Sequence, residues 1–201
     1  MKHNRMYFGL YSLIFFFLYG ILSATPIPEE QLKVNSGRML FTLTKKTESG
    51  YDATMTKYVS MTGLANKFSG NIKLKEKTFD ISMSINLINF FLSGEFKFAN
   101  SRMHETHMNS AKFGTASYKG TIISYDPASG MAKVNGKLTV HGVTKDNFVI
   151  EGKVTKSKTG KGYALRSDFK VDLQDFKIPM PNTKLVEVNQ LVDVKLKLEL
   201  K

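Results

Sequence analysis

Apolar and polar residues alternate along most of this chain. The clearest example is Met131–Thr155, where every second residue is apolar or small and the residues between are mostly polar. The alternation pauses at Gly142–Asp146 and resumes at Phe148. A period of two is typical of a half-buried strand. Two such runs joined by a short glycine-containing loop predict an antiparallel hairpin, with its turn at Gly142–Asp146.

The same alternation recurs in seven other stretches. They are Lys33–Thr44, Thr54–Leu64, Phe68–Lys75, Phe79–Leu87, Ser117–Tyr125, Tyr163–Leu173 and Val192–Leu200. Turn residues separate several of them, most clearly at Asp126–Gly130, where proline presets one backbone angle and glycine tolerates positive φ. The pattern predicts an all-β chain of eight or nine antiparallel strands.

Strands with one consistently apolar face close into a barrel or pack as a sandwich. Closure removes exposed edges, and an antiparallel barrel of about eight strands holds either packed side chains or one ligand. A membrane-spanning barrel would instead turn its apolar face outward. The lysines on the polar face favour a barrel with an apolar interior.

One segment breaks the pattern. Between Ile88 and Phe113 several phenylalanines crowd around Gly94, and a run without Gly or Pro follows from Asn100. We expect a short helical or irregular insertion near residues 88–113. Apolar-rich insertions between strands often have a function, for example as a lid.

Composition narrows the function further. The 201 residues carry a net charge of +12 and contain no Cys and no Trp, which excludes disulfides, Cys-ligated zinc, thiol catalysis and a lipid-anchored cysteine. The 15 Phe and 10 Met suit either a filled core or a deformable cavity. The lysines are scattered, and without a stacking motif or a groove-reading helix we expect no binding to nucleic acid.

The N-terminus is typical of an export signal. Lys2 and Arg5 precede the apolar run Met6–Leu22, small residues follow it, and Pro26 prevents the helix from continuing. We expect a signal helix at residues 1–24 and a barrel domain at residues 32–201. An uncleaved anchor is the alternative, because the run approaches the length of a membrane span. Export without cysteine suggests the bacterial envelope, in the periplasm or outside the cell.

Three stretches carry a family resemblance. Gly136–Gly152, GKLTVHGVTKDNFVIEG, is the strongest. Arg102–Phe113 lies before it and Arg166–Phe169 after it, in the same order as in the family. The chain from about Leu32 to Lys201 resembles the YceI-like family of exported, lipocalin-like barrels that bind polyisoprenoid lipids. The resemblance implies a closed lipocalin-like barrel with a long apolar pocket, and a binding role in place of a reaction.

The candidate binding residues lie mostly in the irregular segment, at the expected mouth of the barrel. The apolar pocket candidates are Phe90, Phe91, Phe96, Phe98, Met108, Phe113 and Tyr118. The candidates for contact with a lipid head group are Arg102, His107 and His141. For each apolar residue, packing in the core is the competing interpretation.

The leading hypothesis is an exported, non-enzymatic protein that carries or sequesters a polyprenyl or quinone-like lipid. The lipid is its ligand, with no further cofactor and no metal. We also expect peripheral association with a membrane and a homodimer.

Two alternatives stay open. His104 and His107, at i and i+3, would share a metal in an envelope enzyme, although no third ligand is evident and the spacing is not HExxH. A basic surface-binding protein with a filled barrel is the other.

Overall fold

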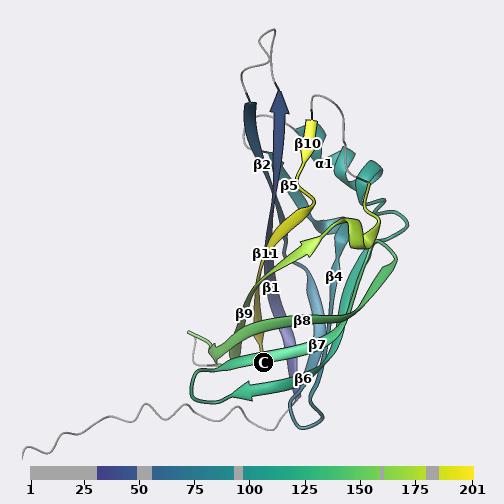
Figure 1. The fold of residues 1–201 in the computed structure, drawn as a ribbon. Helices are drawn as coiled ribbons and strands as arrows, with labels where there is room; N and C mark the ends of the chain where they lie inside the picture. The colour runs from purple at the N-terminus through teal and green to yellow at the C-terminus, as the bar shows by residue number, and fades with distance from the viewer. Residues whose placement is uncertain (1–30, 49–55, 93–96, 159–160, 180–185) are drawn as a thin grey trace, which may run out of the picture.

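The computed structural model describes residues 31–48, 56–92, 97–158, 161–179 and 186–201. Strands dominate, and they wrap around a common interior with one short helix at one end (Figure 1). The strands are β1 Gln31–Glu48, β2 Thr56–Ala65, β3 Phe68–Lys73, β4 Thr78–Ser84, β5 Asn89–Leu92, β6 Thr115–Asp126, β7 Met131–Val140, β8 Val143–Lys156, β9 Tyr163–Asp172, β10 Val186–Val188 and β11 Leu191–Leu200. The helical elements are η1 Ile85–Leu87, α1 Lys97–Arg102, η2 Met103–His107 and η3 Gln174–Phe176.

Eight strands close into a barrel. Their order is β1-β11-β9-β8-β7-β6-β4-β3, and β3 pairs again with β1. Every one of these pairings is antiparallel. The C-terminal part of the long strand β1 continues beyond the barrel. There it pairs with β2 and β10, and β2 pairs in turn with β5. The predicted all-β antiparallel barrel is therefore confirmed, and the sandwich is not formed.

The alternation in the sequence becomes the inside and outside of the barrel. Along β11, Val192, Val194 and Leu198 are buried, whereas Asp193, Lys195 and Lys197 between them are exposed. The other walls follow the same pattern, with Ile81 on β4 and Val134 on β7 in the core. Burial of this continuous apolar face is the main force that closes the sheet.

The two ends of the barrel differ. We call one the helical end, because α1, η2 and η3 lie there, and the other the turn end, because the β3–β4, β6–β7 and β8–β9 connections lie there (Figure 1). At the helical end, Ile85, Ile88, Met103, Met108, Phe176 and Ile178 are all buried. These residues pack as part of the core and close that end.

Two predicted boundaries are wrong. The strand expected at Phe79–Leu87 ends at Ser84, because Ile85–Leu87 form a 3-10 turn in which the Ile85 amide donates to the carbonyl of Gly114 (2.9 Å). Leu87, expected on the apolar face, is therefore 46% exposed.

The hairpin turn expected at Gly142–Asp146 is shorter. Only His141 and Gly142 form it, with Val140 paired to Val143, and both turn residues have positive φ (+51° and +73°). Such two-residue turns match the twist of the strands they join. The break in alternation after Gly142 is a bulge within β8, opposite Gly136–Leu138 of β7.

The predicted signal helix at residues 1–24 lies outside the described residues. Among the residues that are described, no helix combines the length and the apolar character needed to span a bilayer.

Candidate ligand-binding site

An elongated cavity runs inside the barrel. Its volume is about 540 Å³, within the range of roughly 300–1,000 Å³ that is usual for small-molecule pockets. All eight barrel strands contribute to the lining, and most lining side chains are aliphatic or aromatic. An engineered apolar cavity of about 150 Å³ already binds a small apolar molecule. The space here is several times larger, so it suits a longer apolar ligand.

The cavity reaches the surface at the turn end. The exposed residues in its lining, Lys75, Lys77, Ile123 and Ser124, lie in the β3–β4 turn and near the end of β6. At the opposite end, the lining residues Met83, Ala116, Leu138 and Phe169 are buried or half-buried. The opening is thus at the end of the barrel remote from the helical segment.

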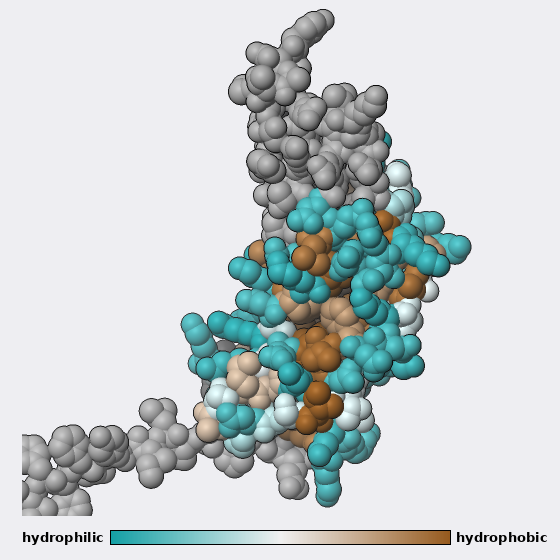
Figure 2. Space-filling view, viewed as in Figure 1, coloured by the Kyte–Doolittle hydropathy of each residue, from teal (hydrophilic) through white to brown (hydrophobic). Residues whose placement is uncertain are grey.

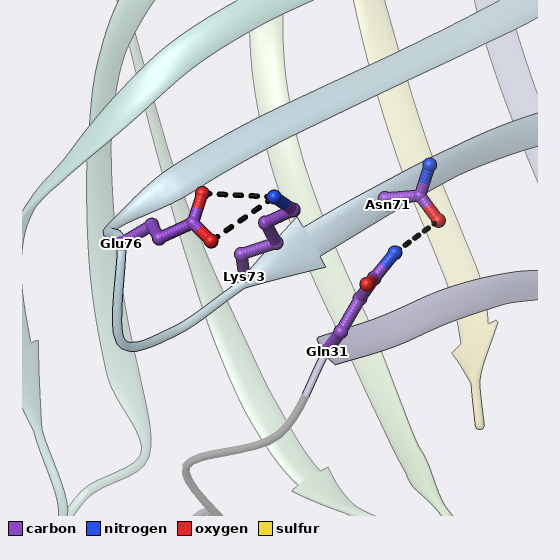
Figure 3. Close-up of polar contacts among 4 residues, drawn as sticks. All are labelled: Gln31, Asn71, Lys73 and Glu76. Atoms are coloured by element: carbon purple, nitrogen blue, oxygen red, sulfur yellow. Dashed lines mark hydrogen bonds and ion pairs between the residues drawn. The ribbon is translucent and has the colours of Figure 1, made fainter.

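Two exposed polar contacts lie at the turn end (Figure 3). Lys73 Nζ lies 3.0 and 2.9 Å from the two carboxylate oxygens of Glu76, across the β3–β4 turn. Gln31 Nε2 donates to Asn71 Oδ1 (3.1 Å), which links β1 to β3. Among the described residues, three pairs are in register between β1 and β3, and this contact adds to that short seam of the barrel.

Two hydroxyl groups from the cavity lining bind the backbone of β8. The Tyr118 hydroxyl lies 2.8 Å from the Phe148 carbonyl oxygen and 3.0 Å from that of Val134. Ser167 Oγ donates to the Glu151 carbonyl (2.5 Å). Among the described residues, registered pairing between β8 and β9 covers Lys153–Lys156 against Tyr163–Arg166, and the Ser167 hydrogen bond to Glu151 joins the two strands beyond that stretch. These polar groups are satisfied by the wall, which leaves the interior apolar.

Burial alters the acidity of Tyr118. Desolvation of the phenol raises its pKa from 10.0 to about 12. The neutral, hydrogen-bonding form therefore persists well above physiological pH. The ring of Tyr118 also forms edge-to-face pairs with Phe79 (centroids 5.8 Å apart) and Phe148 (6.4 Å), and Phe148 forms another with Phe169 (6.0 Å). An aromatic band results along the inner wall.

The predicted apolar pocket residues have different locations. Tyr118 lines the cavity, whereas Met108 is buried in the core at the helical end and Phe113 packs against the β7–β8 turn. Phe90 and Phe91 belong to β5 and Phe98 to α1, but their side chains lie outside the described part, and Phe96 lies outside the described residues altogether. Of the predicted set, the structure places Tyr118 in the cavity lining.

The predicted head-group residues also lie at the helical end. Arg102 is exposed at the end of α1. His107 is buried, and its Nδ1 donates to the Pro179 carbonyl at 2.5 Å. His141 lies in the β7–β8 turn, with its ring 4.4 Å from that of Phe113. The structure does not bring these three side chains together in the cavity lining.

His104 and His107 bind protein groups. His104 Nε2 donates to the Ile88 carbonyl (2.9 Å), and Nδ1 lies 2.8 Å from the Ser110 hydroxyl. Both ring nitrogens of His104 are therefore engaged, which opposes the metal-binding alternative. Within the described part of the chain, no group of three or more metal-ligating side chains is found.

Most of the lining was absent from the predicted site. It comes from the inward positions of ordinary strands: Leu32, Ile72, Ile81, Val134, Ile150, Leu165, Phe169 and Leu196. The signal was present as alternation, which places these residues on the apolar face. Alternation alone does not separate a side chain that fills the core from one that borders a void.

The outer wall also carries apolar side chains. Figure 2 shows them in brown along the middle of one face, with hydrophilic side chains in teal on both sides. The exposed large apolar residues on β6, β7 and β8 are Ile123, Met131 and Val149. Scattered exposed apolar residues are normal on protein surfaces and do not by themselves mark a site.

Solved structures of other proteins share this architecture. A polyisoprenoid binding domain from Saccharophagus degradans, implicated in plant cell wall breakdown, superposes with a TM-score of 0.57 at 12% identity, covering 85% of this chain and 97% of that one. BcnA of Burkholderia cenocepacia superposes with a TM-score of 0.51, also at 12% identity, covering 80% and 94%. At these identities the similarity concerns the fold.

Sequence comparison gives the family. A search of curated proteins found no match. The profile of the YceI-like domain matches residues 41–200, which include most of the barrel. The closed eight-stranded barrel and this match agree, and the chain belongs to the YceI-like family.

Proposed function

We propose that this protein binds a long apolar lipid of the isoprenoid type, polyprenyl or quinone-like, inside the barrel and carries or sequesters it. The observation that carries the proposal is the apolar cavity that runs along the barrel and opens at the turn end. Family membership and the fold shared with a polyisoprenoid binding domain support it. Binding, and not catalysis, is the proposed role.

The driving force is apolar burial. Each CH₂ taken from water contributes about 0.8 kcal/mol, so a long hydrocarbon tail needs no strong polar anchor. The lining is consistent with this mechanism because its hydroxyl groups at Tyr118 and Ser167 already bind backbone carbonyls. A ligand with a hydrocarbon chain therefore meets no unsatisfied polar group from these two side chains.

The direct test is solvent extraction of the native protein followed by mass spectrometry of the extract. We expect an isoprenoid lipid in about stoichiometric amount. A protein purified without lipid should take up polyprenols and quinones, with affinity that rises with chain length until the cavity is filled. A protein that contains no lipid and takes up none of these would refute the proposal.

The cellular location belongs to the same proposal. We propose export to the bacterial envelope, in the periplasm or outside the cell, directed by residues 1–24. Cell fractionation and the intact mass of the purified protein test this, because cleavage near Ser23 or Ala24 removes a defined N-terminal mass. A homodimer stays a prediction, to be measured by light scattering.

A further inference from the structure

Four cations form a row across the outer wall of the barrel. Lys153 of β8 is in register with Arg166 of β9, Arg166 with Lys197 of β11, and Lys197 with Arg38 of β1. All four residues are exposed. Like charges directly opposite each other on neighbouring strands destabilise a sheet. We call these four residues the basic row.

Elsewhere on the same wall, cations are matched with carboxylates on neighbouring strands. The matched pairs are Lys119–Asp80, Lys133–Glu151, Lys137–Asp146 and Lys170–Asp193. Within the described part of the chain, only one member of the basic row forms an ion pair, Lys197 with Glu199 (2.8 Å). The basic row therefore keeps an excess of positive charge that internal contacts do not neutralise.

A hollow accompanies three members of the basic row, Lys153, Arg166 and Lys197. This basic groove has a volume of about 730 Å³, and the described residues of its lining include seven Lys or Arg against one acidic side chain, Glu199. The hydrogen bond from Lys197 is the main cause that lowers the pKa of Glu199, with smaller contributions that include Ser157 and Arg166. Even with Glu199 fully ionised, the groove is strongly cationic, so it favours an anionic occupant.

The basic groove lies at the end where the cavity opens. Leu200 borders both the groove and the cavity, and the inward neighbours of the basic row, Val154 and Leu165, line the cavity. Lys75 and Lys77, at the opening itself, are also exposed. A flat anionic surface that meets the turn end would thus contact the groove and face the opening.

The lining chemistry separates two anionic partners. The described residues that line the groove include no aromatic side chain, whereas proteins that bind single-stranded nucleic acid stack bases on aromatic rings. Clustered Lys and Arg without aromatic platforms suit the phosphates of a lipid surface. Met131 of β7 is exposed and lies in register with Lys153, so an apolar side chain stands beside the end of the basic row.

We propose that the basic groove docks the turn end of the barrel on a membrane surface rich in anionic phospholipid. This inference rests on the proposed function, because it identifies the membrane surface and the end of the barrel at which the lipid would be exchanged. The docking test uses vesicles without isoprenoid lipid, so failure to dock and failure to bind cargo are separate results.

The experiment compares the wild-type protein with the triple variant Lys153→Gln/Arg166→Gln/Lys197→Gln in vesicle co-sedimentation. One vesicle preparation contains equal parts of phosphatidylglycerol and phosphatidylcholine, and the other contains phosphatidylcholine alone. We expect wild-type binding to the anionic vesicles only, weakening as salt is added, and a loss of about 100-fold in the triple variant. Relief of like-charge opposition should leave the variant folded, which circular dichroism checks.

The matched control is Lys119→Gln/Lys137→Gln/Lys170→Gln, which removes the same charge from three residues paired with carboxylates. It should bind the anionic vesicles within about threefold of wild type, because removal of distant, already paired charges has little effect. Three results would overturn the proposal: no binding to anionic vesicles, equal losses in both variants, or equally tight binding of a short DNA duplex that depends on the basic row.

Discussion

At the residue scale, Tyr118 joins three neighbouring strands. It extends from β6, and its hydroxyl contacts carbonyl oxygens of Val134 on β7 and Phe148 on β8. The ring is 6% exposed and faces the cavity. One side chain therefore supplies apolar surface to the cavity and a hydrogen bond to the wall. Loss of a hydrogen bond at a buried site costs about 1–3 kcal/mol.

Tyr118→Phe should lower the free energy of unfolding by about 1–3 kcal/mol at pH 8, as measured by urea denaturation. The difference should shrink at high pH. Burial raises the pKa of Tyr118 to about 12, so the folded state holds the phenol proton more tightly than the unfolded state. This contribution is fully present below pH 10 and is lost as the pH rises towards 12. A difference that stays constant from pH 8 to beyond pH 10 would contradict this account.

At the element scale, the β7–β8 hairpin depends on two residues with positive φ. Gly142 adopts φ +73°, and a Cβ there would lie 2.5 Å from the Phe113 ring. His141, at φ +51°, packs its own ring on Phe113. The tip of the hairpin and the end of the helical segment are therefore packed together.

Gly142→Ala should lower the free energy of unfolding by about 1–3 kcal/mol, because the new methyl group meets both the backbone strain and the Phe113 ring. Thermal unfolding measures the loss. His141→Gly relieves the positive φ but removes a ring contact, so it should change stability by less. A Gly142→Ala protein as stable as wild type would show that the turn can relax.

The histidines of η2 have a similar structural role. His107 is buried, and its hydrogen bond to Pro179 links the helical segment to the chain after η3. His107→Ala should cost about 1–3 kcal/mol in thermal or urea unfolding, because it removes a buried side chain together with its hydrogen bond. A chelator should leave the wild-type melting temperature unchanged. Stoichiometric metal that disappears in His107→Ala would instead support the enzyme alternative.

At the scale of the whole molecule, the two ends of the barrel have different roles. The helical end is packed with apolar side chains, and the turn end opens the cavity and carries the basic groove. Entry of a lipid from the turn end would need no movement of the helical segment. The described residues of the predicted lid segment, 88–92 and 97–113, therefore lie away from the opening of the cavity.

The role of the cavity in lipid binding can be tested by making the same Ala→Phe substitution at two positions. Ala132 lines the cavity, whereas Ala128 is exposed in the β6–β7 turn. Ala132→Phe should fill part of the cavity and reduce uptake of a long polyprenol by about tenfold or more, measured by lipid extraction after incubation. Ala128→Phe should leave uptake unchanged. Equal uptake by both variants would indicate that the ligand binds elsewhere.

Much of the fold could be predicted from local patterns. Which residues of β4, β7, β9 and β11 face inward follows from a period of two, since neighbouring side chains on a strand point to opposite faces. The predicted turn at Asp126–Gly130 is confirmed. It is a local structure, in which the Asp126 carboxylate accepts a hydrogen bond from the amide of Ala128 (3.0 Å). The binding site was less predictable. An irregular aromatic segment is conspicuous in a sequence, but Met108 and Phe113 pack at the closed end.

Alternation along the chain, a local property, was enough to establish strands, faces and an apolar interior. Tertiary structure decided the closure of the barrel through pairs as distant as Val34 with Leu200, and it decided which end opens. It also placed Lys153, Arg166, Lys197 and Arg38 in one row, because the register of four strands is set by packing between them. The cavity and the basic row both arise from contacts between segments that are distant in the sequence, so they exist only in the folded chain.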